Sequence, residues 1–153
     1  MKVVLQRVLH ASVAVNDQII GKIGKGYLLL LGVENDDTVE VTYKMADKIC
    51  KLRIFQDDQG KTNLSLADIG GEILVVSQFT LYADCRKGNR PSFIKSGAPE
   101  LANHLYEQMI RRLKESGYKV EQGSFGEEMK VELLNDGPFT LILNSRELGM
   151  EEQ

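Results

Sequence analysis

The sequence lacks tryptophan and is poor in cysteine, histidine and proline, with two, two and three of these in its 153 residues. Two cysteines cannot form a disulfide framework, and neither has the spacing of a zinc site. No apolar run approaches the ~20 residues that span a bilayer, and the first residues lack a signal-peptide pattern. We therefore expect a cytoplasmic protein with no membrane segment, no metal centre and no cofactor.

Common catalytic motifs are missing as well. There is no Gly-rich phosphate loop with its lysine and no G-x-S-x-G segment. His10 falls at a predicted strand end and His104 within a predicted helix, where structural roles are favoured. Cys85 has no histidine close in sequence to activate it, so a nucleophilic role is disfavoured. The net charge of −3 argues against broad nucleic-acid binding, so any RNA contact must be focused on a local patch.

What is present is the composition of an ordinary globular domain, with 42% hydrophobic and 27% charged residues. We expect one domain over residues 1–153, because this length buries roughly two-thirds of the unfolded surface in a single core. Strand patterns occupy residues 2–8, 12–15, 18–23, 26–33, 72–83, 118–123, 129–134 and 139–144, with a turn at residues 16–17 and a loop holding one short strand at residues 56–72.

Two segments have helical periodicity. The first is read from its apolar spacing at Val41, Met45, Ile49 and Leu52, with Asp37 and Glu40 as a capping box and Cys50 on the core side. The second begins near Pro99, ends at Gly117 and has the apolar face Leu101, Leu105, Met109 and Leu113. The order of elements predicts an α+β fold, with a predominantly antiparallel, barrel-like sheet and two main helices packed outside it.

Two polar interruptions break the apolar strands. In "ILVVSQFTLYA", Ser77, Gln78 and Thr80 either line a pocket or form the solvent face of a strand. In "LLNDGPFTLIL", the Asn-Asp-Gly run is typical of a hairpin turn, but Pro138 is an awkward first residue for a strand. Because X-Pro bonds are cis in only ~5–6% of folded cases, the pattern alone favours trans for Gly137-Pro138.

These two segments also carry a family resemblance. "SQFTL" at residues 77–81 together with "NDGPFT" at 135–140 closely resembles the two signature motifs of the D-aminoacyl-tRNA deacylases, the D-Tyr-tRNA deacylase family. The segments "MKVVLQRV", "RKGNRPSF" at 86–93 and "FGEEMKVELLNDGP" at 125–138 also look like this family, so the resemblance covers essentially the whole chain. Phe139 departs from it, since a smaller valine is common there.

The resemblance implies a homodimeric enzyme that hydrolyses the ester between a D-amino acid and the 3′-terminal adenosine of tRNA. It implies that Gly137-Pro138 is cis and enters the active site of the other subunit. There its carbonyl oxygens would hold the substrate's amino group, and its backbone would clash with an L-side chain. Glycine would pass this filter, so the resemblance also implies cleavage of glycyl-tRNA mischarged on tRNA-Ala.

The resemblance assigns catalysis to Ser77, Gln78, Phe79 and Thr80, with backbone N–H groups near Gln78 and Phe79 forming an oxyanion hole. Thr80 is a second option as nucleophile, although no base to activate it is recognisable. In the family's alternative mechanism the 2′-hydroxyl of the terminal ribose helps to activate water, so that the protein mainly positions and polarises the ester.

The remaining substrate-binding residues also follow from the resemblance. Arg7 would hold the Gly-Pro loop, Phe125 and Met129 would contact the adenine, and Lys87 and Arg90 would contact phosphates. The rival interpretations are a surface salt bridge for Arg7, core packing for Phe125 and Met129, and a solvated loop for the two basic residues. A non-catalytic nucleic-acid-binding dimer and a purely structural dimer stay as alternative functions, and catalytic turnover distinguishes the enzyme from both.

Overall fold

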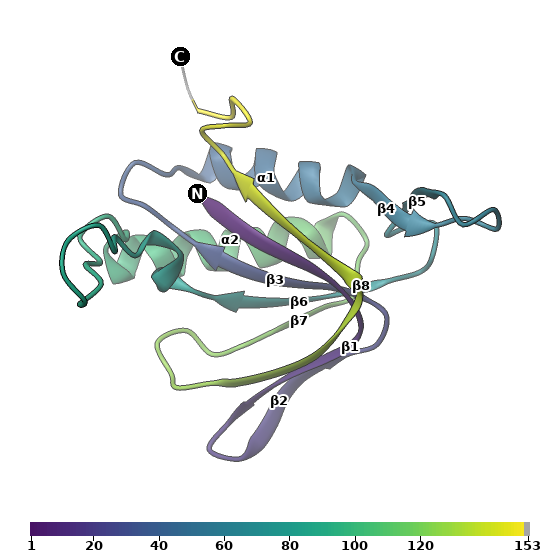
Figure 1. Ribbon diagram of the computed structural model, residues 1–153, viewed down its shortest axis with the longest axis horizontal. Coiled ribbons are helices and arrows are strands. Elements are labelled where there is room, and N and C mark those ends of the chain that lie inside the picture. The colour runs from purple at the N-terminus through teal and green to yellow at the C-terminus, as the bar shows by residue number, and fades with distance from the viewer. Residues whose placement is uncertain (152–153) are drawn as a thin grey trace.

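The computed structural model describes residues 1–151 (Figure 1). Its elements in chain order are β1 (Lys2–Val15), β2 (Gln18–Ile23), β3 (Gly26–Gly32), α1 (Val39–Lys51), β4 (Arg53–Gln56), β5 (Thr62–Ser65), β6 (Glu72–Ser77), a 3-10 turn (Phe79–Tyr82), α2 (Pro99–Glu115), β7 (Val120–Gln122) and β8 (Lys130–Asn144). None of the helices in this part of the chain is long and apolar enough to cross a membrane.

One sheet dominates the molecule, in the order β2-β1-β3-β6-β7, with β8 added along β1. The long strand β1 pairs antiparallel with β2, β3 and β8, whereas β3–β6 and β6–β7 are parallel. The two parallel pairs follow from the helices, because α1 lies in the connection from β3 to β6 and α2 in that from β6 to β7. The predicted α+β class is confirmed, with antiparallel pairs in the majority: three against two in the main sheet, and the separate β4–β5 hairpin adds a fourth.

The sheet curls until its two ends nearly meet. A Cβ added to Gly21 of β2 would lie 2.9 Å from the carbonyl oxygen of Gln122 in β7, so glycine allows the close approach of these strands. The inside of the curl holds one buried cluster that includes Val13, Leu28 and Leu74. The larger cluster lies between the sheet and the helices, which pack on one side of it as predicted (Figure 1). Strand β3 is continuously apolar because both of its faces are covered.

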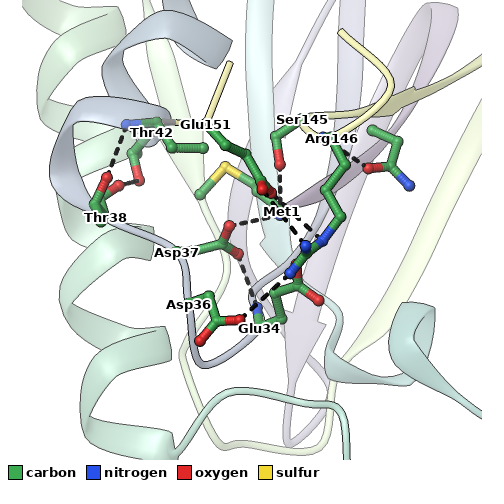
Figure 2. A network of polar contacts seen from close by, with 11 residues as sticks. Met1, Glu34, Asp36, Asp37, Thr38, Thr42, Ser145, Arg146 and Glu151 are labelled. Atoms are coloured by element: carbon green, nitrogen blue, oxygen red, sulfur yellow. Dashed lines mark hydrogen bonds and ion pairs between the residues drawn. The ribbon is translucent and has the colours of Figure 1, made fainter. Parts of the chain in front are cut away.

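The predicted capping box at the start of α1 is wrong. Thr38 is the N-cap, and its hydroxyl accepts a hydrogen bond from the N–H of Val41 at 3.2 Å. The Asp37 carboxylate instead accepts from the α-ammonium group of Met1 at 2.7 Å and from the N–H of Glu34 at 2.8 Å (Figure 2). A long-range ionic partner has therefore displaced the local cap.

Three strand predictions are also corrected. The chain at 72–83 leaves the sheet after Ser77 and forms the 3-10 turn. Residues 2–8 and 12–15 belong to one strand, β1. The predicted strands 129–134 and 139–144 are likewise one strand, β8, which begins at Lys130, so the Asn-Asp-Gly run does not turn a hairpin. Instead β8 bulges: Val8 pairs with Asn135 and Gln6 with Thr140, so that Arg7 alone faces four residues of β8. The turn at residues 16–17 is confirmed.

Candidate active site

A cavity of about 660 Å³ opens where β3 and β6 end, beside the start of α2 and the segment before β8. Five of the residues singled out in the sequence line it, namely Ser77, Gln78, Phe79, Phe125 and Met129. Other lining residues include Phe93, Ser96, Ala98 and Glu127. Ser77 and Gln78 are half-buried, so the interpretation of "SQFTL" as a pocket wall fits the structure better than that of a solvent-facing strand.

The 3-10 turn determines which backbone donors are available to the cavity. The N–H of Gln78 donates to the carbonyl oxygen of Leu31 at 2.7 Å, so it is not free to form an oxyanion hole. No hydrogen bond within residues 1–151 is donated by the N–H of Phe79. The carbonyl oxygen of Phe79 accepts from the hydroxyl of Ser96 at 3.1 Å, which restrains this residue. Phe79 is thus the free donor of the two.

Thr80 lies outside the cavity lining. Its side chain is exposed, and its hydroxyl oxygen accepts a hydrogen bond from the side-chain amide of Gln78 at 2.5 Å. Of the described residues that line the cavity, Glu127 alone carries an ionisable side chain, and no pattern in the sequence singles it out. His10 and His104 are exposed elsewhere, on β1 and α2.

Phe125 and Met129 are held in the cavity wall by neighbouring backbone and by α2. The Met129 sulfur accepts a hydrogen bond from the N–H of Ser124 at 3.3 Å, and the Phe125 ring lies 6.0 Å from the ring of Tyr106. The Tyr106 hydroxyl lies 3.1 and 3.3 Å from the carbonyl oxygens of Val75 and Gly123. Burial raises the pKa of Tyr106 to about 12, which keeps this hydroxyl a donor.

The Gly137-Pro138 peptide is cis, as the family resemblance implies and contrary to the trans bond that the pattern alone favours. Arg7 is buried beside it and donates from Nε to the carbonyl oxygen of Asp136 at 3.0 Å, with its guanidinium 4.6 Å from the centre of the Phe139 ring. The Asn135 side chain accepts from the N–H of Phe139 at 3.1 Å and donates to its carbonyl oxygen at 2.9 Å. The bulge is therefore held rigidly by side chains on both strands.

Gly137 and Pro138 are exposed and do not line the cavity. Arg7, beside them, pairs with Tyr27, which in turn pairs with Ile73. Ile73 precedes Ser77 by four residues, a distance of about 13 Å along β6. The Gly-Pro peptide and the cavity are thus at different ends of the sheet.

Lys87 and Arg90 lie on an exposed loop next to the cavity. The loop is closed by two backbone hydrogen bonds between Asp84 and Ser92, of 2.7 and 2.9 Å. Arg86 pairs with Asp84 at 2.7 Å and holds the pKa of that carboxyl well below its usual range. Neither Lys87 nor Arg90 makes an ion pair within residues 1–151, so both charges are available to a ligand.

The fold recurs in solved structures. One is titled "Structural Analysis of a probable eukaryotic D-amino acid tRNA deacylase"; it has a TM-score of 0.79 and 21% identity, covers 93% of this chain and 97% of its own, and shows the fold alone. A second, named c-Myc DNA Unwinding Element Binding Protein, has a TM-score of 0.88 and 40% identity and covers 94% and 98% of the two chains.

Residues 4–144 match the sequence profile of the family described as D-Tyr-tRNA(Tyr) deacylase. The chain is 54% identical to a D-aminoacyl-tRNA deacylase of Lactobacillus acidophilus, over 94% of this chain and 99% of the relative. It is 55% identical to one of a Geobacillus species, over 96% and 97%. The chain therefore belongs to the D-Tyr-tRNA(Tyr) deacylase family, whose members are hydrolases.

Proposed function

We propose that this protein hydrolyses the ester that joins a D-amino acid to the 3′-terminal adenosine of tRNA. The observation that carries the proposal is the cavity, because residues of both "SQFTL" and "FGEEM" line it. The chain that forms this cavity is more than half identical to proteins named D-aminoacyl-tRNA deacylase. The adenosine occupies the wall of Phe125 and Met129, and the ester carbonyl lies near Phe79. The recycling of mischarged tRNA is the purpose of such an activity.

The site is completed by a second copy of the chain. The exposed Gly137-Pro138 peptide lies too far from the cavity of its own chain to act there, so a homodimer supplies it from the partner. The rigid hold of Arg7 and Asn135 on this bulge supports its use as a steric filter. Backbone that clashes with an L-side chain excludes L-aminoacyl esters whatever the side chain is. It does not exclude glycyl-tRNA, because glycine has no side chain to clash.

Catalysis in this proposal uses few protein groups. The N–H of Phe79 stabilises the developing oxyanion, a kind of donor often worth ~10²–10³ in rate. The 2′-hydroxyl of the terminal ribose helps to activate the attacking water. Thr80 is disfavoured as nucleophile because it lies outside the cavity lining and beside no recognisable base.

The test compares D-Tyr-tRNA, L-Tyr-tRNA and glycyl-tRNA with the purified protein at low concentration. We expect rapid loss of the D-ester and of the glycyl ester and persistence of the L-ester, with the same rates in the presence of a chelator. Equal hydrolysis of both tyrosyl esters would contradict the chirality filter, and an intact glycyl ester would contradict its backbone basis.

A second candidate function is nucleic-acid binding without catalysis, favoured by the name of the 40% identical DNA Unwinding Element Binding Protein. The overall charge of −3 counts against extended DNA binding. Turnover in the deacylation assay decides between the two functions. Tight DNA binding with no loss of any ester would favour the second.

A further inference from the structure

An exposed aromatic pair lies at the edge of the cavity. Phe79 is 55% exposed and Phe93 38% exposed, and both line the cavity. Their ring centres are 5.1 Å apart in an edge-to-face arrangement. Ile94, which follows Phe93, is 87% exposed. Large apolar side chains left open beside a cavity are typical of a binding surface.

The same place carries an unusual charge. Residues 84–95 hold the cations Arg86, Lys87, Arg90 and Lys95 against the single carboxylate of Asp84, so this segment has a net charge of +3 in a chain whose total is −3. In Figure 1 it belongs to the teal loop between β6 and α2. Exposed aromatic rings beside unpaired cations are the features with which proteins bind single-stranded nucleic acid.

We propose that this surface, residues 84–95 together with Phe79, binds the nucleotide that precedes the terminal adenosine in the single-stranded 3′ end of tRNA. Its base stacks on Phe93, and its phosphates face Lys87 and Arg90. The proposal rests on the proposed function, because an adenosine in the cavity directs the preceding nucleotide out over the aromatic pair. The charge of the segment favours a phosphate backbone over an apolar protein partner.

The experiment uses two substrates that differ only beyond the terminal adenosine. These are D-Tyr-tRNA and D-tyrosyl-adenosine, which carries the same ester without any further nucleotide. We expect Phe93→Ala to raise KM for the tRNA about tenfold more than KM for the adenosine ester, because the variant loses the stacking of one base on the ring. Phe93→Tyr restores the tRNA value because it keeps the ring.

The charges are tested by the salt dependence of KM. Lys87→Ala/Arg90→Ala is expected to reduce the slope of log KM against log salt by about one to two with tRNA, because fewer counterions are released. The matched control is Lys48→Ala/Lys51→Ala, which removes two exposed lysines from α1 and leaves the slope unchanged.

Two results would overturn the proposal. If Phe93→Ala raised KM equally for both substrates, Phe93 would belong to the adenosine pocket alone. A shift of the Phe93→Ala variant toward monomer in sedimentation would assign the aromatic pair to the subunit contact. Either failure leaves the unmodified protein active, whereas failure of the proposed function itself would leave both substrates intact with the unmodified protein.

Discussion

At the scale of single residues, the Gly-Pro peptide is held in position by the side chains of neighbouring residues. Arg7 reaches from β1 to the carbonyl oxygen of Asp136, and it also donates to the carbonyl oxygen of Ile54 at 2.6 Å. Asn135 bonds both backbone groups of Phe139. The chirality filter that we propose is made of backbone and must be held in this way, because a displacement of about 1 Å is enough to lower a rate ~10²-fold.

Gly137→Ala tests this hold. Gly137 has φ of +143°, and an added Cβ would lie 2.8 Å from the backbone nitrogen of Phe139 and 3.1 Å from Arg7 Nη2. We expect kcat/KM for D-Tyr-tRNA to fall about a hundredfold. Gly60→Ala is the control, since it also replaces a glycine of positive φ but meets nothing within 4 Å. Similar activities of the two variants would show that the position of Gly137 is unimportant.

Thr80→Ala tests the assignment of the nucleophile. Because Thr80 lies outside the cavity lining, we expect the variant to keep activity within about tenfold of the unmodified protein. D-Tyr-tRNA with a 2′-deoxy terminal ribose should instead react at least ~10²-fold more slowly with both proteins. The opposite pattern, an inactive variant and a reactive deoxy substrate, would establish Thr80 as the nucleophile.

At the scale of elements, ionic contacts join the strand ends that shape the curl. Glu72 at the start of β6 lies 2.7 Å from Lys119, just before β7, and accepts from the N–H of Gly24 at 2.8 Å, between β2 and β3. These contacts lower the pKa of Glu72 below its ordinary value of 4.5, with the Lys119 bond as the larger cause. One carboxylate thus connects four strands.

The pH dependence of stability follows from this shift. A carboxyl whose pKa is depressed in the folded state contributes stability above its unfolded pKa, and this is lost as the pH falls through the folded pKa. We expect Glu72→Gln to lower the free energy of unfolding at pH 7 and the difference from the unmodified protein to shrink as pH falls below 4.5. Urea titrations across this range measure it. If the free energies of unfolding of the two proteins differed by the same amount at every pH, the ionisation of Glu72 would not contribute to stability as described.

The elements also show how far the sequence predicts the fold. Periodicity located both helices and most strands, because local apolar spacing and core burial agree there. Periodicity failed where contacts with distant residues determine the local structure. The Asp37 carboxylate binds the α-ammonium group of Met1 and does not cap α1. Arg7 holds the bulge of β8 where the sequence pattern predicts a turn. Of the pocket residues, Ser77 and Gln78 were indicated by the polar interruption of an apolar run and Phe79 by family resemblance, whereas Tyr106 and Glu127 carry no local signal.

At the scale of the whole molecule, the cavity and the Gly-Pro bulge, which the proposed function joins in one site, do not meet within one chain. The cavity lies at the end of β6, and the Gly-Pro bulge lies at the other end of the sheet, exposed. Along β8, alternate side chains face outward, and Leu134 and Ile142 among them are 47% and 73% exposed. These two exposed apolar side chains, one on each side of the bulge, fit the contact with a second copy that the proposed function requires.

Subunit mixing tests this arrangement most directly. Ala98→Trp fills the mouth of the cavity, and Gly137→Ala displaces the bulge, so each variant alone should keep about a hundredth or less of the unmodified activity on D-Tyr-tRNA. After denaturation and refolding together in equal amounts, half of the dimers combine both chains, and each of these has one intact site. We expect about a quarter of the unmodified activity to return. A mixture whose activity stays at the level of the separate variants, although mixed dimers form, would contradict a site shared between subunits.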